Sequence, residues 1–226
     1  MATQWYCRLM GTELGPFTSK QLLEMARSHR LMPDDSVKQG AEGMWVAAHR
    51  VKRLFDDASA STIIMARGFP KSQFLGIDYH SDSIATARQR AREAGVDNAR
   101  FEVATAKNFA GRDFDLICFM DCLHDLGDPA GALVHARNAL KPDGKVMLVE
   151  PYAGDTVEEN LNPIGRLFYA ASTMACTPNY LSQEVGLALG AQAGEERLRR
   201  LAQQAGFRDL RLATRTPVNL VMEIIR

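Results

Sequence analysis

The pattern of apolar and polar positions changes near residue 58. Before it, short alternating runs predict three strands, at residues 5–9, 36–39 and 45–48. A helix is predicted from Phe17 to about His29, with Leu22, Leu23 and Ala26 on one face and Thr18 or Ser19 as its cap. Gly11 and Gly15-Pro16 are predicted to form a turn. Residues 1–57 therefore read as a small α+β module.

From residue 59 on, predicted strands alternate with predicted helices. The strands are expected at 73–78, 100–105, 114–120, 145–150, 210–214 and 218–225. The helices are expected at 61–67, 82–94, 129–140, 162–176 and 195–205. The run at 114–120 is continuously apolar, which is typical of a strand covered on both faces, and residues 141–144 read as a turn. The last two strands are separated only by a tight turn, so they should pair antiparallel and complete an α/β domain over 59–226.

Composition excludes several classes of function. The 27 basic residues balance the 27 acidic ones, so a nucleic-acid or membrane-surface role has no electrostatic support. No apolar run approaches the roughly 20 residues that span a bilayer, and we expect a cytoplasmic protein. The four cysteines, Cys7, Cys118, Cys122 and Cys176, form no CxxC and no ligand-like pairing with histidine. We therefore predict reduced thiols and no metal site, and the oligomeric state stays open.

The first segment resembles the GYF-like domain found at the ends of many bacterial proteins. The resemblance rests on Trp5-Tyr6, Gly15-Pro16-Phe17, Gln21-Leu22, Leu31-x-Pro33-Asp34 and Gly43-Met-Trp45-x-x-Ala48. It implies a proline-rich peptide or protein partner bound on aromatic faces. The Gly-Tyr-Phe tripeptide itself is absent. The alternative is that Trp5, Tyr6, Phe17 and Trp45 are simply the core of the module.

The second segment resembles the class I methyltransferases that use S-adenosylmethionine. The resemblance rests on Gly76-Ile-Asp78, Phe114-Asp-Leu-Ile117, Leu140-Lys-Pro-Asp-Gly144 and Gly206-Phe207 before the two final strands. It implies a Rossmann-like α/β sheet, S-adenosylmethionine as cofactor and a small-molecule methyl acceptor.

The same resemblance implies the cofactor site. Asp78 would accept hydrogen bonds from the ribose hydroxyls, with Tyr79 beside the adenosine. Thr105 and Ala106 would line the adenine pocket, and Asp121 and Cys122 would lie beside the sulfonium. The alternative for Asp78 is that it caps the helix beginning at Ser81 or Asp82.

His124 is the catalytic candidate. The segment His124-Asp125-Leu126-Gly127-Asp128 resembles the His-Asp-Trp-x-Asp segment of small-molecule O-methyltransferases, with leucine in place of tryptophan. The resemblance implies that the histidine deprotonates a substrate hydroxyl, a task that an imidazole with a pKa of about 6.5 suits. The alternative is helix capping or substrate positioning. Residues 162–193, with Tyr169, Met174 and Tyr180, are either a lid over an apolar acceptor or plain core.

One part of the family pattern is missing. The first strand and its glycine-rich turn should precede the helix near Ser59, yet no glycine occurs between Gly43 and Gly68. Residues 51–58 are too charged for a strand buried on both faces. We therefore predict an incomplete sheet. Two functions remain open: a methyltransferase, whose amides come from an unconventional loop or a partner, and a non-catalytic adaptor or pseudo-methyltransferase that acts through the GYF-like module.

Overall fold

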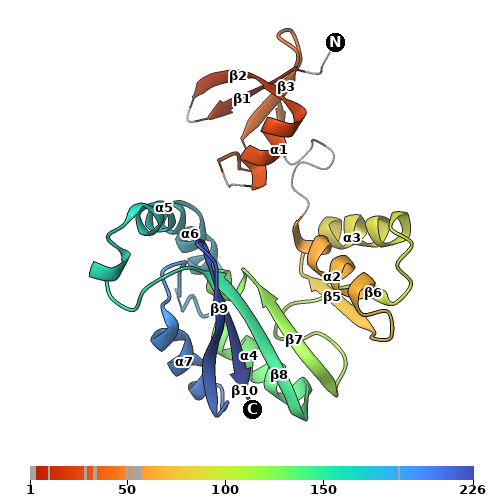
Figure 1. Cartoon of the computed structure of the whole chain (residues 1–226), viewed down its shortest axis with the longest axis vertical. Coiled ribbons are helices and arrows are strands. Elements are labelled where there is room, and N and C mark those ends of the chain that lie inside the picture. Colours follow the sequence, from red (N-terminus) through yellow and green to blue (C-terminus); the bar gives the residue numbers. More distant parts are fainter. Residues whose placement is uncertain are drawn as a thin grey trace. The chain divides into compact units, whose positions relative to one another are not determined.

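The computed structural model of the chain describes residues 4–9, 11–27, 30–32, 35–48, 51, 57–187 and 189–226. Contacts group the chain into two compact units (Figure 1). One comprises Met1–Gly76 and Ala85–Arg100, and the other comprises Ile77–Ile84 and Phe101–Arg226. The predicted domain boundary at 57–59 adjoins residues 52–56, which lie outside the described residues, and it stays a prediction.

The GYF-like module contains a four-stranded antiparallel sheet in the order β2-β1-β3-β4. Its strands are β1 (Gln4–Leu9), β2 (Thr12–Thr18), β3 (Ser36–Gln39) and β4 (Val46–Ala47). The predicted turn at Gly15-Pro16 is wrong, because both residues lie inside β2. Strand β2 is an edge strand, where the missing N–H of proline is tolerated. A Cβ on Gly15 would lie 2.8 Å from the Trp5 carbonyl oxygen, so the two strands approach closely here.

Helix α1 (Ser19–Arg27) begins at a capping box. The Thr18 hydroxyl accepts the Gln21 amide at 3.2 Å, and the Gln21 side chain accepts the Thr18 amide at 2.9 Å. Leu22 and Ala26 are buried as predicted, and Met25 joins them on the buried face. The core of the module is small and consists of Cys7, Leu22, Met25, Ala26, Leu31, Val37 and Ala48.

A second pair of strands follows. The elements are α2 (Asp57–Gly68), β5 (Phe74–Asp78), α3 (Ser81–Glu93) and β6 (Ala99–Val103). Strands β5 and β6 form a two-stranded sheet of their own. The Asn98 side chain donates hydrogen bonds to the carbonyls of Ala66, Phe69 and Ser72, which fixes the end of α2 and the loop after it.

The main sheet has the order β7-β8-β10-β9. Its strands are β7 (Phe114–Met120), β8 (Leu140–Pro151), β9 (Asp209–Arg215) and β10 (Asn219–Ile225). β7 and β8 are parallel. β10 pairs antiparallel with β9, as the tight turn predicted, and it also pairs antiparallel with β8. The prediction of a turn at 141–144 outside the strand is wrong, because β8 already begins at Leu140. Those residues belong to β8 and bulge out between Leu140 and Lys145, where the register against β7 jumps.

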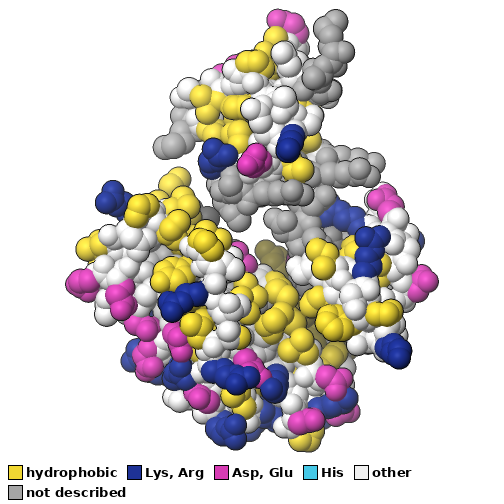
Figure 2. All heavy atoms as spheres, in the orientation of Figure 1, with side chains coloured by type: hydrophobic (Ala, Val, Ile, Leu, Met, Phe, Trp, Pro, Cys, Tyr) yellow, Lys and Arg dark blue, Asp and Glu magenta, His cyan; other side chains and the backbone are white. Residues whose placement is uncertain are grey.

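Helices α4 (Pro129–Ala139) and α7 (Glu195–Gln204) supply buried side chains to the core that they share with this sheet. Strand β7, however, is at the edge of the sheet, and Leu116 on it is 48% exposed. The expectation that this strand is covered on both faces is therefore wrong, and Figure 2 shows apolar side chains gathered over it. Among the described residues, no strand pairs with the other edge of β7, in accord with the predicted loss of the first strand.

The predicted helix at 162–176 is longer than expected and changes type along its length. A 3₁₀ turn, η3 (Glu158–Asn160), precedes α5 (Pro163–Ala171), a π-helical segment η4 (Ser172–Cys176) and α6 (Thr177–Leu181). The Asn162 side chain caps α5 by accepting the Gly165 amide at 2.9 Å. In the part of the chain that the structure describes, no helix combines the length and apolar character needed to cross a bilayer.

The main core generates a stability prediction. Leu148 is fully buried at the centre of β8, so Leu148→Ala should lower the free energy of unfolding by about 2–5 kcal/mol. Leu116→Ala makes the same chemical change at the exposed site on β7 and should cost less than about 1 kcal/mol. Urea unfolding followed by circular dichroism measures both. Equal losses in the two variants would contradict the assignment of the core.

Candidate functional site

The site begins where β7 ends. Asp121 follows the strand with a φ of +54°, a left-handed conformation that is uncommon outside glycine, and its amide donates to the Val149 carbonyl at 2.7 Å. The chain then enters a short 3₁₀ helix, η2 (Leu123–Asp125). This turn directs His124 toward the end of β8.

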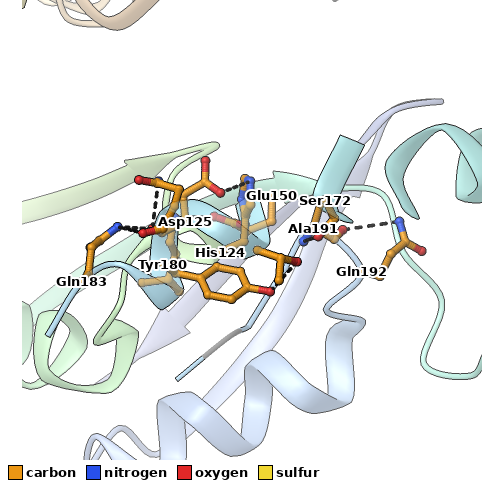
Figure 3. Close-up of polar contacts among 11 residues, drawn as sticks. His124, Asp125, Glu150, Ser172, Tyr180, Gln183, Ala191 and Gln192 are labelled. Carbon is orange, nitrogen blue, oxygen red and sulfur yellow. Dashed lines mark hydrogen bonds and ion pairs between the residues drawn. The ribbon is translucent and has the colours of Figure 1, made fainter. Parts of the chain in front are cut away.

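A buried carboxylate holds His124. His124 is 5% exposed and Glu150, on β8, is 1% exposed. His124 Nδ1 lies 2.6 Å from Glu150 Oε2, and the Leu123 amide donates to Glu150 Oε1 at 2.9 Å. Both oxygens of the carboxylate are therefore engaged, and the imidazole ring is fixed with Nε2 directed away from Glu150 (Figure 3).

Two further side chains meet the other side of the imidazole. Asp125 Oδ1 lies 3.5 Å from His124 Nε2, and the Cys176 sulfur forms a hydrogen bond with His124. The imidazole, carboxylate and sulfur atoms of His124, Asp125 and Cys176 all lie within 4.8 Å of one another. The expectation that no cysteine pairs with a histidine is thus wrong. It failed because the two residues are distant in sequence and meet only through the fold.

The helix that carries Cys176 is tied to the histidine segment. Gln183 donates to the Asp125 carbonyl at 3.0 Å and accepts the Gly127 amide at 2.9 Å. Cys176 is buried in a small cluster with Tyr180 and Ala191. Of the residues considered for a lid, Tyr180 is therefore core, whereas Tyr169 and Met174 are exposed.

The electrostatics of the cluster favour a charged imidazole. Burial alone lowers the pKa of His124, but the hydrogen bonds with Cys176 and Glu150, and the charges of Glu150 and Asp125, raise this pKa to about 11. Burial raises the pKa of Glu150, and the hydrogen bond from His124 opposes that rise. Burial also raises the pKa of Cys122 to about 12 and that of Cys118 to about 11, which keeps both thiols protonated.

Two of the residues expected to bind cofactor share a pocket. Tyr79, which is 72% exposed, and Thr105 lie on a cavity of about 390 Å³. The rest of its lining is Glu102, Val103, Ala104, Asn108 and Ala110. Ala106 lies outside this lining and packs against the main core.

The other expected residues lie elsewhere. Asp78 Oδ1 accepts the His80 amide at 2.8 Å in a turn that precedes α3, whereas the Ser83 amide of the helix donates to His80 Nδ1 at 3.4 Å. His80 therefore takes the capping position that the alternative gave to Asp78. Asp121 and Cys122 follow β7, where Cys122 packs half-buried against the main core, and neither lines the cavity beside Tyr79.

Two residues of the cluster, Glu150 and Cys176, were not among the site candidates drawn from the sequence, and Asp125 was part of the candidate segment without a catalytic role. Glu150 carries a signal that could have found it, since it follows the apolar run Val146–Val149 inside a buried strand. A charged residue in such a position needs a partner.

Comparison with known proteins decides the family. A family model described as "Methyltransferase domain" matches residues 58–206, and one described as "GYF domain 2" matches residues 5–54. The chain belongs to the methyltransferase-domain family. Its N-terminal module is a GYF-like domain, as predicted.

Similar proteins agree with this assignment. The chain is 30% identical over 125 residues to the uncharacterized methyltransferase YcgJ of Bacillus subtilis, a match that covers 54% of this chain and 49% of YcgJ. The S-adenosylmethionine-dependent methyltransferase SibL superposes with a TM-score of 0.58 at 18% identity, over 75% of this chain and 48% of SibL. PigF with SAH gives 0.55 at 14% identity, over 72% of this chain and 46% of PigF.

The fold class is therefore confirmed as a Rossmann-like α/β methyltransferase fold with a small N-terminal module. The chain spans about half the length of these relatives.

The His124–Glu150 pair predicts a pH dependence of stability. A histidine whose folded pKa lies near 11 stabilises the fold fully below its unfolded pKa of about 6.5, and this contribution is lost as the pH rises toward 11. The free energy of unfolding should therefore fall between pH 7 and pH 9 by up to about 1.4 kcal/mol per pH unit.

Glu150→Gln keeps the shape of the side chain but removes the charge, so it should flatten this fall. His135→Gln, a histidine outside the cluster, should leave the fall unchanged. Urea midpoints measured across this pH range test the expectation, and a Glu150→Gln variant with the wild-type slope would contradict it.

Proposed function

We propose that the chain transfers a methyl group from S-adenosylmethionine to an oxygen of a small molecule, and that the acceptor binds at the end of β7. The observation that carries this proposal is the buried pair of His124 and Glu150. A histidine oriented by a carboxylate, at the end of a strand, is an arrangement suited to general acid–base chemistry. The methyltransferase-domain match over residues 58–206 supports the reaction type.

His124 has two tasks in this proposal. As the charged imidazolium favoured at neutral pH, it donates a hydrogen bond from Nε2 and orients the acceptor oxygen. Only the neutral form can accept the hydroxyl proton at Nε2, so the imidazolium must first release its Nε2 proton, while Glu150 holds the ring through Nδ1. Alignment of the oxygen with the methyl group that the cofactor supplies is the other requirement for an in-line displacement.

The cavity lined by Tyr79 and Thr105 is the place we assign to the adenosine, and Ala106, which packs against the main core, would adjoin it through Thr105. The ribose would bind through the Asp78 carboxylate, whose Oδ1 already accepts the His80 amide, and Asp121 and Cys122 would face the sulfonium. The chain offers no glycine between Gly43 and Gly68 to cradle the methionine part, so we expect modest affinity.

A second candidate function is a binding role for the GYF-like module. Its aromatic residues divide into two groups. Trp5 and Phe17 pack against the core of the module, whereas Tyr6 and Trp45 are not part of it. The Arg8 guanidinium lies 4.4 Å from the centre of the Trp45 ring, and Lys38 lies 4.8 Å from Trp45 and 5.1 Å from Tyr6. We assign Tyr6 and Trp45 to a proline-rich peptide because they are not part of the core, and the peptide would share their rings with Arg8 and Lys38.

Isothermal titration with S-adenosylmethionine tests the main proposal. Binding in the micromolar range is expected, and Asp78→Ala should weaken it at least about tenfold because it removes a charged hydrogen-bond acceptor. Asp82→Ala, an exposed acid in the first turn of α3, is the matched control and should bind like the wild type. No heat at millimolar cofactor would refute the catalytic function.

Peptide titration tests the second candidate. Proline-rich peptides should shift the tryptophan fluorescence of the full chain, and Tyr6→Ala and Trp45→Ala should each abolish the shift. Phe17→Leu changes an aromatic residue that packs against the core instead, and it should retain binding. If no peptide of a broad proline-rich panel changed the tryptophan fluorescence of the wild-type chain, Tyr6 and Trp45 would have no ligand-binding role.

A further inference from the structure

We propose that His124, Asp125 and Cys176 form a three-ligand site for a divalent transition metal ion, with zinc as the best match. The donor atoms are His124 Nε2, Asp125 Oδ1 and Cys176 Sγ. This site shares His124 with the proposed methyl transfer: an ion on Nε2 would replace the proton of the charged imidazole and would take over the activation of the acceptor from that nitrogen. It depends on no cofactor and on none of the residues around the cavity beside Tyr79.

The geometry of the three side chains suits a tetrahedral ion. The atoms that each residue offers lie within 4.8 Å of one another, and His124 Nε2 and Asp125 Oδ1 are 3.5 Å apart. Zinc bonds to nitrogen, oxygen and sulfur of about 2.0–2.3 Å put neighbouring tetrahedral ligands roughly 3.3–3.6 Å apart. Small side-chain adjustments therefore bring all three atoms to one ion.

The surroundings of the three ligands point to the same conclusion. Metal-binding histidines usually donate their second ring nitrogen to a carboxylate, which fixes the ring and strengthens the ligand. Glu150 does this here at 2.6 Å, and it is itself held by the Leu123 amide. Figure 3 shows His124 with Asp125 and Glu150 gathered around it.

Asp125 supplies an independent observation. Its Oδ1 atom is buried and makes no hydrogen bond, although this atom faces the cluster. Oδ1 is held by the 3.5 Å ion pair with His124 Nε2 and not by a hydrogen bond, and a cation bound between these two atoms would give this buried acceptor a closer partner.

The donor set selects the ion. One nitrogen, one oxygen and one sulfur ligand suit zinc, whereas magnesium and calcium require oxygen ligands. Three protein ligands leave a fourth position for water or a substrate oxygen, as in catalytic zinc sites. An ion held here would lower the pKa of a hydroxyl in that position, which suits the activation of an acceptor.

The test uses the full chain stripped with a chelator and titrated with Co²⁺, and then with Zn²⁺ in competition. We expect one ion per chain, with the intense visible bands of tetrahedral cobalt and a thiolate-to-cobalt charge-transfer band. Cys176→Ala should abolish the charge-transfer band. Cys118→Ala, which removes a half-buried thiol outside the cluster, should keep the band and the affinity.

Two more variants separate ligands from supporting residues. Asp125→Asn changes a partly exposed residue and should weaken Co²⁺ at least about tenfold without unfolding the chain. Glu150→Gln should weaken binding about 10- to 100-fold but preserve the charge-transfer band, since Glu150 contacts the histidine and not the ion. Failure to bind either ion, or binding with a band that survives Cys176→Ala, would overturn the proposal.

Discussion

A carboxylate buried inside a sheet has to be paired with a charge or with hydrogen-bond donors. In this protein the buried carboxylate is Glu150, and its partners determine the path of the segment that follows β7. Removing a carboxylate from water costs several kcal/mol unless charge and hydrogen bonds compensate. The compensation comes from the Leu123 amide and from His124, so the segment after β7 must turn back onto the end of β8. The hydrogen bonds of Gln183 then attach the long helix of α5, η4 and α6 to that same segment. The acceptor side of the site thus depends on one acid.

The sequence pattern predicted the strands well where a short apolar run is bounded by turn-forming residues. Strands β3 and β7 occur at the predicted residues, because each is a short run bounded by turn residues. The predictions for Gly15-Pro16 and residues 141–144 failed for a different reason: turn-forming residues are also tolerated at a sheet edge and in a bulge, and pairing partners decide between these outcomes.

The candidate site was only half predictable. The motif that contains His124 could be found from spacing, but its partners could not. Glu150 and Cys176 reach it through strand pairing and helix packing, which no local pattern specifies. Because these partners could not be predicted, the pKa of His124 could not be predicted either. An isolated imidazole suits proton transfer at neutral pH, whereas the cluster holds this one in its charged form.

In this methyltransferase fold the strands form two separate sheets. Strands β5 and β6 pair with each other, and β7 to β10 form a separate sheet. The residues assigned to the adenosine lie at the end of the first pair, and the histidine cluster lies at the end of the second sheet. The acceptor side contains its own hydrogen bonds and core, so it does not depend on the glycine-rich turn of the family for its construction.

The π-helical segment at Ser172–Cys176 has an evolutionary consequence. Such segments contain one residue more than a regular helix of the same span, so a single-codon deletion would restore α-helical pairing. The widened turn accommodates the extra residue locally, so the deletion would leave the flanking helices α5 and α6 oriented as they are and would remodel only the turn that ends at Cys176. The contact between sulfur and imidazole therefore depends on the shape of one helical turn, and it could be gained or lost in one mutational step without a change of fold.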